Sequence, residues 1–463
     1  MERIVFRKVE LWVVGLIVVI GLLGVVAFGA MVRSRAMGFE RYGMAGDVAI
    51  EIASIPATLK DILEQDDRMT SVWNEDRFVG KSGWTITPAA GAPEIPGYLL
   101  LSRFDGDLRA HVVELVDLRS FETVRSWSPS GEQAFDGVSV SALYVNPAIS
   151  DPSFRAIHPL LMENGDLIIK DHYAPLARVD ACGRPRWQIG IPVHHATERG
   201  PDGSLWIPAV YDPPMMERAG AGAYDDMILS VSPEGEVIFQ RSLGQMLIDN
   251  GYGYLVNGMH DGYEADRLHL NDIQPVMEDG EFWNRGDLFL NMRNRSTVAL
   301  YRPSTDKIIW LRSGPWSFQH DVDIVGDGVI AVFDNNVSAG QTGLQVNGAN
   351  RIMAYDFTSD TARPMMAQAF AETDVRTITE GLFTLLPSGH VLVEEENYGR
   401  LLIFAPDGSV AAEYVNGAGD GKPYRMGWSR YIDEAQAQRV LAATATLRCG
   451  AAGTDTASVA GSR

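Results

Sequence analysis

Basic side chains are scarce in this chain. Its 463 residues contain 39 Lys and Arg against 60 Asp and Glu, so the formal net charge is −21 at pH 7. Nucleic-acid binding requires a basic surface that neutralises phosphates, and the composition therefore excludes nucleic acid as a partner. The acidic excess is spread along the chain and favours solubility. An anionic small molecule would need a local positive pocket.

Two motifs of common phosphate and acyl chemistry are missing as well. The chain has no P-loop for nucleotide phosphates and no strand–Gly–Ser–Gly elbow of a serine hydrolase. The segment Asp306–Trp310 resembles the aromatic turns of quinone-cofactor propellers, but such turns mostly reflect packing between sheets. We therefore expect no cofactor.

Cysteine is nearly absent, with only Cys182 and Cys449 in the whole chain. In an oxidising compartment the two could join the C-terminal tail to the body of the protein. Two unrelated thiols are an equal alternative, so the sequence leaves the pairing open.

An unbroken apolar run extends from Leu11 to Val32. It is long enough to cross a bilayer, which takes about 20 residues. A secretory signal is the competing interpretation, but its apolar region is shorter, about 7–15 residues, and ends at a small-residue cleavage site. Ala27, Gly29 and Ala30 form a poor cleavage site, so we expect an uncleaved anchor. Basic residues flank the run almost equally, and charge alone does not set its orientation.

Repeated turn-and-strand segments follow a helical pattern that runs from Met44 to about Asp66. Six segments each place an Asn-Gly, Asp-Gly or similar turn before an apolar strand, at a spacing typical of propeller blades. A tandem of β-sandwiches is the alternative, but it would not repeat like residues at like positions. The sequence thus predicts an all-β, six-bladed β-propeller preceded by one transmembrane helix and a short helical neck. The expected boundaries are 1–35 for the anchor, 36–75 for the neck, 76–432 for the propeller and 433–463 for a partly disordered tail.

Three histidines and an arginine stand near the starts of these repeats: His195, His269, Arg293 and His320. His195 precedes the turn glycine of its segment by the same offset as His320 does in its own. Since inner propeller strands line a central channel, equivalent starts should face one another across it. A neutral imidazole is a nucleophile toward sulfur or phosphorus, and a guanidinium binds their oxygens in a planar fork.

These residues also have other interpretations. A lone histidine near a strand start is usually a satisfied polar residue. Asp272 and Asp321 lie near the histidines and could suggest a metal site, but the arginine favours an anion, so no metal is expected. His194 could replace His195, and His158 is interpreted as channel lining. The remaining histidines are expected to be structural or exposed: His172, His260 and His390.

The stretch from His194 to Tyr431 resembles the bacterial arylsulfate sulfotransferases, most clearly between His269 and Asn336. The similarity lies in His-x-Asn at 269–271, the Arg-Asn strand, Ile-Trp, Gln-His-Asp at 319–321 and Phe-Asp-Asn at 333–335. The resemblance implies a six-bladed propeller facing the periplasm. The anchor expected from the apolar run would then lie in the inner membrane, with the N-terminus in the cytoplasm. It also implies sulfuryl transfer from a phenolic sulfate ester to a phenol through a sulfohistidine. No nucleotide donor is used, and no phosphosulfate-binding loop is found.

By this resemblance His320 is the nucleophile, while His269, Arg293 and His195 hold the sulfate and assist proton transfer. The residues expected to bind substrate are His194, Asn271, Gln319 and Arg430, the last in a Ser-Arg-Tyr motif similar to a closing motif of the family.

Three features depart from the family pattern. Ala196 stands where an Asp usually follows the double histidine, Asn291 replaces a serine, and a membrane helix replaces an N-terminal β domain. Two further functions therefore stay open. One is a non-catalytic propeller subunit of a membrane complex, with the insertion 211–226 as a contact surface. The other is a hydrolase of sulfate or phosphate esters.

Overall fold

The computed structural model describes residues 10–36, 41–49, 51–53, 55, 77–87, 94–138, 140, 149–216, 223–258, 264–340 and 343–449. The chain divides into two units, Met1–Gln65 with His260–Glu264, and Asp66–Met259 with Ala265–Arg463. The predicted contact loop 211–226 lies partly outside the described residues, and so does His260.

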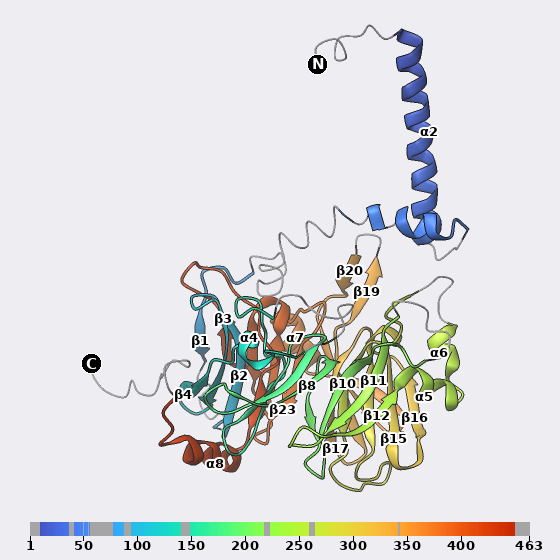
Figure 1. The fold of residues 1–463 in the computed structure, drawn as a ribbon. Helices are drawn as coiled ribbons and strands as arrows, with labels where there is room; N and C mark the ends of the chain where they lie inside the picture. Colours follow the sequence, from blue (N-terminus) through green and yellow to red (C-terminus); the bar gives the residue numbers. More distant parts are fainter. Residues whose placement is uncertain are drawn as a thin grey trace. The chain divides into compact units, whose positions relative to one another are not determined.

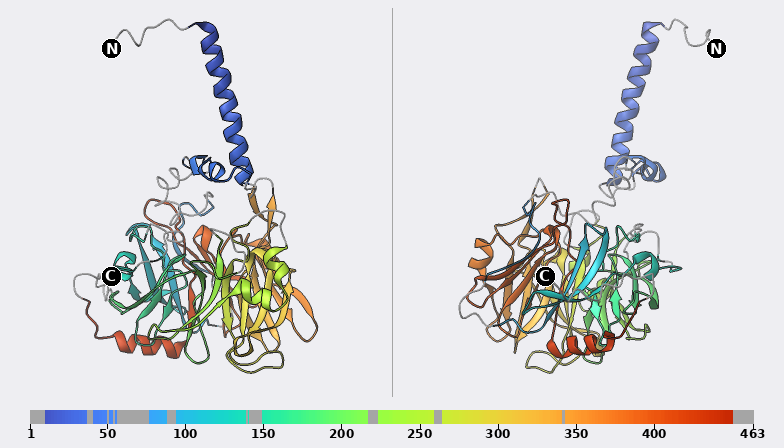
Figure 2. Two further views of the ribbon diagram at one scale, coloured as in Figure 1. Left: turned by 45° about the vertical axis from the view of Figure 1, so that its right-hand side comes forward. Right: turned by 90° about the vertical axis from the view of Figure 1, so that its left-hand side faces the viewer.

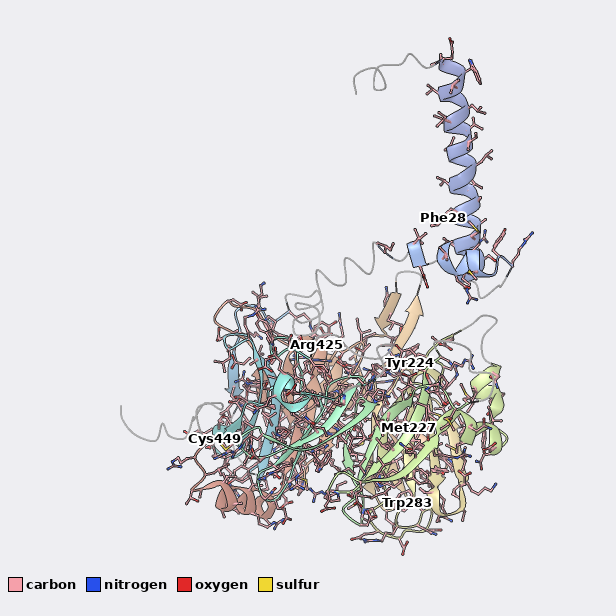
Figure 3. All side chains as sticks on the ribbon, in the orientation of Figure 1. Phe28, Tyr224, Met227, Trp283, Arg425 and Cys449 are labelled. Atoms are coloured by element: carbon pink, nitrogen blue, oxygen red, sulfur yellow. A yellow bond between two sulfur atoms is a disulfide. The ribbon has the colours of Figure 1, made fainter. Side chains whose placement is uncertain are left out.

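The first unit contains one long apolar helix, α2 (Leu11–Ala36). Its 26 residues extend about 39 Å at 1.5 Å per residue, more than the ~30 Å hydrocarbon core of a bilayer. The most apolar window has a mean hydropathy of 2.9 and none of it is buried, so the side chains project freely from the helix (Figure 3). A membrane span and a signal sequence share these properties. Of the predicted neck, residues 44–49, 51–53 and 55 are helical and residues 41–43 form a turn, and residues 56–75 lie outside the described residues.

The second unit is a β-propeller, whose sheets follow one another in chain order (Figures 1 and 2). The strands predicted after the six turns are all observed, as β2, β6, β10, β14, β18 and β24. The first sheet has the order β27-β2-β3-β4. Its strands are β2 (Tyr98–Asp105), β3 (Ala110–Asp117), β4 (Glu122–Trp127) and β27 (Arg430–Ile432).

An eight-stranded sheet comes next in the chain. It consists of two four-stranded groups joined by a single pairing of Val193 with Ala209. The first group comprises β5 (Leu160–Leu161), β6 (Leu167–Ile169), β7 (Ala174–Val179) and β8 (Pro185–Val193). The second comprises β9 (Glu198–Arg199), β10 (Leu205–Tyr211), β11 (Asp225–Val231) and β12 (Val237–Ser242).

Three further sheets complete the propeller. One contains β13 (Leu270–Pro275), β14 (Leu288–Met292), β15 (Thr297–Arg302) and β16 (Lys307–Ser313). The next contains β17 (His320–Gly326), β18 (Val329–Asp334), β21 (Arg351–Asp356) and β22 (Thr361–Met365), with a separate hairpin of β19 (Val337–Gly340) and β20 (Gly343–Val346). The last contains β23 (Leu382–Leu385), β24 (Val391–Glu395), β25 (Arg400–Phe404), β26 (Val410–Val415) and β1 (Gly83–Ile86).

Short helices connect the strands at several places. They are α4 (Gly131–Ala134), α5 (Leu243–Asp249), α6 (Gly253–Asn257), α7 (Ala367–Glu372) and α8 (Glu434–Thr444), with the 3-10 turns η1 (Arg293–Arg295), η2 (Pro303–Thr305) and η3 (Glu396–Tyr398).

The two ends of the propeller sequence meet in one sheet. The late strand β27 pairs with the early strand β2, with Tyr98 opposite Ile432. This pairing protects a strand edge that would otherwise be open. Apolar side chains of neighbouring sheets then pack face to face, for example Leu115 of β3 in one cluster with Leu167 of β6. Each such buried Leu contributes about 1.5–3 kcal/mol.

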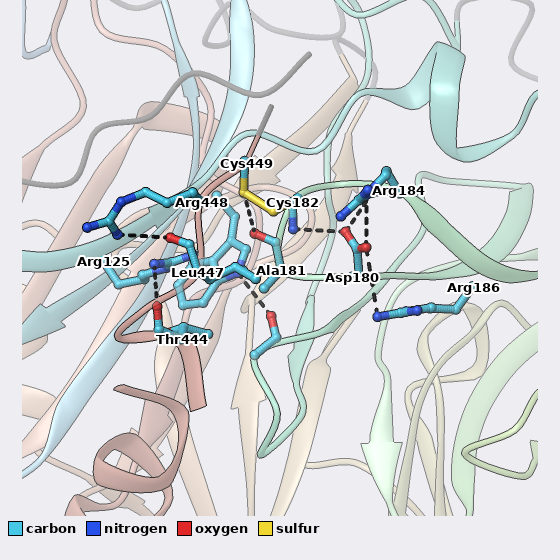
Figure 4. The surroundings of a disulfide bond; sticks show 12 residues. Arg125, Asp180, Ala181, Cys182, Arg184, Arg186, Thr444, Leu447, Arg448 and Cys449 are labelled. Carbon is cyan, nitrogen blue, oxygen red and sulfur yellow. Dashed lines mark hydrogen bonds and ion pairs between the residues drawn. A yellow bond between two sulfur atoms is a disulfide. The ribbon is translucent and has the colours of Figure 1, made fainter. Parts of the chain in front are cut away.

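The described part of the tail is held against the propeller. Ala437 and Val440 of α8 belong to the same apolar cluster as β2 and β6. Beyond this helix, Cys449 forms a disulfide with Cys182 in the turn between β7 and β8 (Figure 4). The disordered tail predicted from about residue 451 lies outside the described residues.

Candidate functional site

Three of the predicted histidines meet at one place in the propeller. The ring centroid of His195 lies 4.9 Å from that of His269 and 5.9 Å from that of His320. All three come from strand starts: His195 precedes β9, His269 precedes β13, and His320 is the first residue of β17. The three imidazoles therefore line one cluster, which we call the histidine cluster.

A shared backbone conformation explains why these starts converge. Left-handed φ values, which non-glycine residues rarely adopt, occur at His195 (53°), His269 (57°) and, next to His320, at Asp321 (53°). The same conformation occurs before β5, β23 and β27, at His158, Glu380 and Trp428. A left-handed residue thus stands at the start of each of these inner strands. At His195 and His269 the histidine is itself that residue, whereas His320 immediately precedes it.

His320 is held at both ring nitrogens. Asn335 donates through its Nδ2 to the backbone oxygens of Thr377 (3.2 Å) and Glu380 (2.9 Å), so its Oδ1 must be the acceptor for His320 Nδ1–H at 2.7 Å. The lone pair is then on Nε2, which accepts the backbone N–H of Glu380 at 3.1 Å. Burial, followed by the nearby Arg293, holds the pKa of His320 well below its usual value of 6.5. The ring is therefore neutral at pH 7.

His269 is paired with a carboxylate that sequence reasoning missed. Its Nδ1 lies 2.5 Å from Asp266 Oδ2. Burial alone would raise the pKa of Asp266, but His269 and Arg293 outweigh burial and lower it. An ionised carboxylate only accepts hydrogen bonds, so Nδ1 carries the proton. Nε2 of His269 is then the nitrogen that can exchange protons with a ligand.

Arg293 supplies the positive charge of the site. It opens the 3-10 turn η1, and its backbone N–H donates to the oxygen of His269 at 3.0 Å, which ties the two residues together. Its guanidinium stacks 4.9 Å from the Phe318 ring, and Nη1 donates to Asn294 Oδ1 at 2.8 Å. Burial lowers the pKa of Arg293, with Asp266 acting in the opposite direction. A guanidinium nevertheless stays protonated in proteins.

His194 and His195 contact each other through their Nδ1 atoms at 2.8 Å. Burial is the first cause that lowers the pKa of each, and neighbouring histidines are the second, so both rings are neutral at pH 7. The ring of His194 also lies 4.8 Å from that of Tyr173. His194 therefore contacts both His195 and Tyr173.

The remaining residues expected to bind substrate have partners within the fold. Asn271 donates to the backbone oxygen of Gln319 at 3.1 Å, and Gln319 donates to Asn291 Oδ1 at 2.6 Å; all three are fully buried. Arg430 pairs with Glu198 at 3.2 Å. Their part in substrate binding stays a prediction.

Sequence reasoning placed His172 among structural or exposed residues, yet its ring lies 4.4 Å from that of His195. Its Nε2 is 2.6 Å from Glu380 Oε1, and Glu380 was not singled out at all. The repeat register was a usable signal: Glu380 precedes its turn glycine, Gly389, by one residue more than His320 precedes Gly328. Asp266 gave no such signal, because it lies in an irregular segment before β13.

The cluster has the chemistry of an anion site. Within the part of the chain that the structure describes, no group of three or more His, Cys, Asp or Glu is arranged to hold a metal ion. A guanidinium and several imidazole nitrogens can instead contact the oxygens of a small oxyanion ester. The neutral Nε2 of His320 can attack its central atom.

Residues 158–417, more than half of the chain, match the family model described as "Arylsulfotransferase (ASST)". No curated protein matches the chain. Similar solved structures include a protein of unknown function from Bacteroides caccae (12% identity, TM-score 0.46, covering 73% of this chain and 100% of that chain). The hydrazine synthase of Kuenenia stuttgartiensis has 11% identity and a TM-score of 0.38, with 70% and 80% covered. The WD40 β-propeller domain of Doa1 has 12% identity and a TM-score of 0.36, with 77% and 99% covered. None of these structural likenesses bears on chemistry.

Proposed function

Since this chain belongs to the arylsulfotransferase family, we propose that it moves the sulfuryl group of a phenolic sulfate ester to a second phenol. The observation that carries the proposal is the meeting of His195, His269 and His320 in one cluster beside Arg293. The substrates are two phenols in turn, one as its sulfate ester, and no nucleotide donor is needed.

The first chemical step falls to His320. Its Nε2 lone pair attacks sulfur, the bond between sulfur and the aryl oxygen breaks, and a sulfohistidine forms. Asn335 keeps the proton on Nδ1, so the sulfated ring carries a positive charge and remains a good leaving group. Attack by the second phenol on sulfur then breaks the N–S bond and restores the neutral imidazole.

The sulfuryl oxygens need donors that are present before the reaction starts. Arg293 offers a planar fork of N–H groups, and its stacking on Phe318 fixes the plane. His195 and His269 border the same space. Donors held in place at a site of low dielectric stabilise developing charge more than water does.

Proton transfer is assigned to His269 with Asp266. His269 acts as an imidazolium that is protonated on both nitrogens beside the Asp266 carboxylate. In the first half-reaction the departing aryl oxygen takes the Nε2 proton and leaves the ring neutral, and in the second half-reaction the incoming phenol returns a proton to Nε2. Asp266 keeps hold of Nδ1–H throughout. This division leaves His320 free to act as nucleophile only.

We also infer six blades and a membrane anchor. The eight-stranded sheet consists of two four-stranded groups joined at one residue pair, and a left-handed residue precedes or starts the inner strand in each of six groups. The disulfide between Cys182 and Cys449 supports an oxidising compartment such as the periplasm. The apolar helix α2 would then serve as the anchor, with the N-terminus in the cytoplasm.

The decisive experiment uses the full chain in mild detergent with 4-nitrophenyl sulfate and phenol. We expect nitrophenol release that increases with phenol, and an intact mass higher by one sulfuryl group when phenol is omitted. His320→Gln should abolish both signals. His390→Gln is the matched control, since its side chain bonds only Ser388 among the described residues.

Two results would contradict the proposal and favour one of the alternative functions. Release that does not depend on added phenol favours a hydrolase. A wild-type protein with no turnover and no adduct, purified with a stoichiometric partner, favours the non-catalytic subunit.

A further inference from the structure

The backbone of Glu380 contacts one nitrogen of the His320 ring directly and the other through Asn335. Its N–H donates to Nε2 at 3.1 Å. Its carbonyl oxygen accepts Asn335 Nδ2 at 2.9 Å, which orients the amide oxygen that accepts Nδ1–H of His320 at 2.7 Å. One residue therefore influences the direction of the ring and the position of its proton.

The carboxylate of Glu380 is clamped among four donors. Oε1 accepts from His172 Nε2 at 2.6 Å and Arg155 Nη2 at 3.5 Å. Oε2 accepts from Arg425 Nη2 and from Asn397 Nδ2 at 3.4 Å. Burial alone would raise the pKa of Glu380, but Arg425 and Arg155 outweigh it and hold the pKa well below the usual range. The group is thus a buried, fully bonded anion.

This clamp coincides with an unusual backbone. Glu380 has φ of 57°, in the left-handed region that residues with a Cβ rarely adopt, and Gly381 follows at 90°. Such a conformation persists only where the surroundings over-determine it. Here the surroundings are the two buried arginines and His172, and the result is an N–H aimed at His320.

We propose that Glu380 is a positioning residue for sulfuryl transfer. It holds the tautomer of His320, and its backbone N–H donates a hydrogen bond to the transferred sulfuryl group. The proposal rests on the proposed function. In the resting protein the N–H caps the Nε2 lone pair. When Nε2 attacks, this hydrogen bond breaks, the N–S bond forms and the S–O bond breaks. The aryl oxygen takes its proton from His269, and the freed N–H donates to an oxygen of the new sulfuryl group.

Glu396 provides a matched control inside the same charge network. It lies 2.5 Å from Arg155 Nη1 and 3.6 Å from Arg425 Nη2, so it shares both arginines with Glu380. Neither its side chain nor its backbone is bonded to His320 or Asn335 among the described residues. Glu396 also hydrogen-bonds the Glu380 side chain. Glu380→Gln and Glu396→Gln therefore make the same chemical change beside the same arginines, and only the first alters the residue whose backbone contacts His320 and Asn335.

The Glu380 carboxylate accepts hydrogen bonds from four donors, and Glu380→Gln replaces it with an amide that has one acceptor oxygen. Its NH2 group must then face a guanidinium or an imidazole N–H, which breaks half of the clamp. We expect kcat to fall about 10- to 100-fold, as is typical of a residue that supports a reacting ligand, with KM nearly unchanged. Glu396→Gln should keep kcat within about twofold, since burial and then Glu380 raise the pKa of Glu396 toward its neutral form, which the neutral amide of Gln resembles.

A second readout does not depend on activity. In full-length protein with ¹⁵N-labelled histidine, the His320 signal (assigned by its loss in His320→Gln) should show a neutral ring with the proton on Nδ1. Glu380→Gln should mix the two tautomers, and Glu396→Gln should not. If Glu380→Gln misfolds, Glu380→Gly accepts the left-handed φ, keeps the N–H and removes only the clamp, and we expect the same two changes.

The outcomes separate this inference from the function on which it rests. Wild-type protein that never forms a sulfohistidine contradicts the proposed function, while the tautomer measurement still reports on Glu380. If Glu380→Gln and Glu380→Gly retain both the wild-type tautomer and the wild-type kcat, the positioning role is overturned.

Discussion

Asp266 and His269 are three residues apart, and their Oδ2 and Nδ1 atoms lie 2.5 Å from each other. A further pair of bonds fixes the segment, because the backbone N–H groups of His269 and Leu270 donate to the carboxylate of Asp226, both at 3.1 Å. The imidazole is thus held by its backbone and by one ring nitrogen, and the other nitrogen remains for proton exchange.

Asp266→Asn should slow sulfuryl transfer from poor leaving groups more than from good ones. Phenyl sulfate needs a proton on the departing oxygen, and general acid–base assistance is typically worth about 10²–10⁴-fold. Nitrophenolate leaves without a proton, so its release should change little. The measurement is the rate of sulfohistidine formation for a series of phenyl sulfates, which should depend more steeply on the pKa of the phenol.

Asp249→Asn serves as the control, because Asp249 pairs with Arg241 at the surface, on α5. It should leave the whole series unchanged. Equal losses for phenyl and nitrophenyl sulfates in Asp266→Asn would contradict the assigned proton transfer.

Arg293→Lys tests whether the shape of the guanidinium matters, since the charge is kept. Lys lacks the planar fork and the stacking on Phe318. Hydrogen bonds to charged groups are worth ~1.5–3 kcal/mol, so we expect kcat/KM to fall about tenfold or more, with weaker inhibition by inorganic sulfate. Steady-state kinetics with 4-nitrophenyl sulfate measures both quantities.

Arg312→Lys matches this change closely at another place. Arg312 also stacks 4.9 Å from an aromatic ring, that of Tyr355, and it also forms a polar contact at 2.8 Å, with Asp360. Its substitution should leave kcat/KM unaltered. If the two variants lose activity equally, Arg293 has no special part in holding the sulfuryl group.

The repeat pattern located His195, His269 and His320 because each stands at the start of an inner strand, where a left-handed residue recurs. That rule depends on local sequence and needs no knowledge of distant contacts. Glu380 also stands at the start of an inner strand, one residue further from its turn glycine than His320 is from its own. Its side chain is a carboxylate, so a pattern of repeated histidines does not include it.

The contacts of the supporting residues could not be predicted from the sequence, for a different reason. His172 meets Glu380 across 208 positions of sequence, and Arg155 meets it across 225. Such contacts follow from the closure of the propeller, which brings early and late sheets together. A single sequence contains no periodic signal for them. Predicting them would require the relative placement of the sheets as well as their strands.

The pH dependence of the first half-reaction should reflect the nucleophile. Burial and Arg293 lower the pKa of His320, so the protonated, inactive form appears only below the usual value of about 6.5. With 4-nitrophenyl sulfate, which needs no acid, sulfohistidine formation should stay constant from pH 8 to about 6.5 and fall at lower pH. Stopped-flow detection of nitrophenol in single turnovers measures this profile. A midpoint at or above the ordinary histidine value would contradict the assignment of His320 as the buried nucleophile.

The disulfide between Cys182 and Cys449 should stabilise the closed propeller. It links residues 267 positions apart, and the enclosed segment contains most of the sheets. Removing a native disulfide typically costs about 2–5 kcal/mol, with larger loops at the upper end in the chain-entropy model. Reductant should therefore lower the Tm of the wild-type protein by several degrees, as followed by the loss of β-sheet circular dichroism. The Cys182→Ser/Cys449→Ser double variant should begin at this lower Tm and ignore reductant. If its Tm instead equals that of the oxidised wild type, then the pairing of β27 with β2 and the packing of Val440 of α8 close the ring without help from the covalent link.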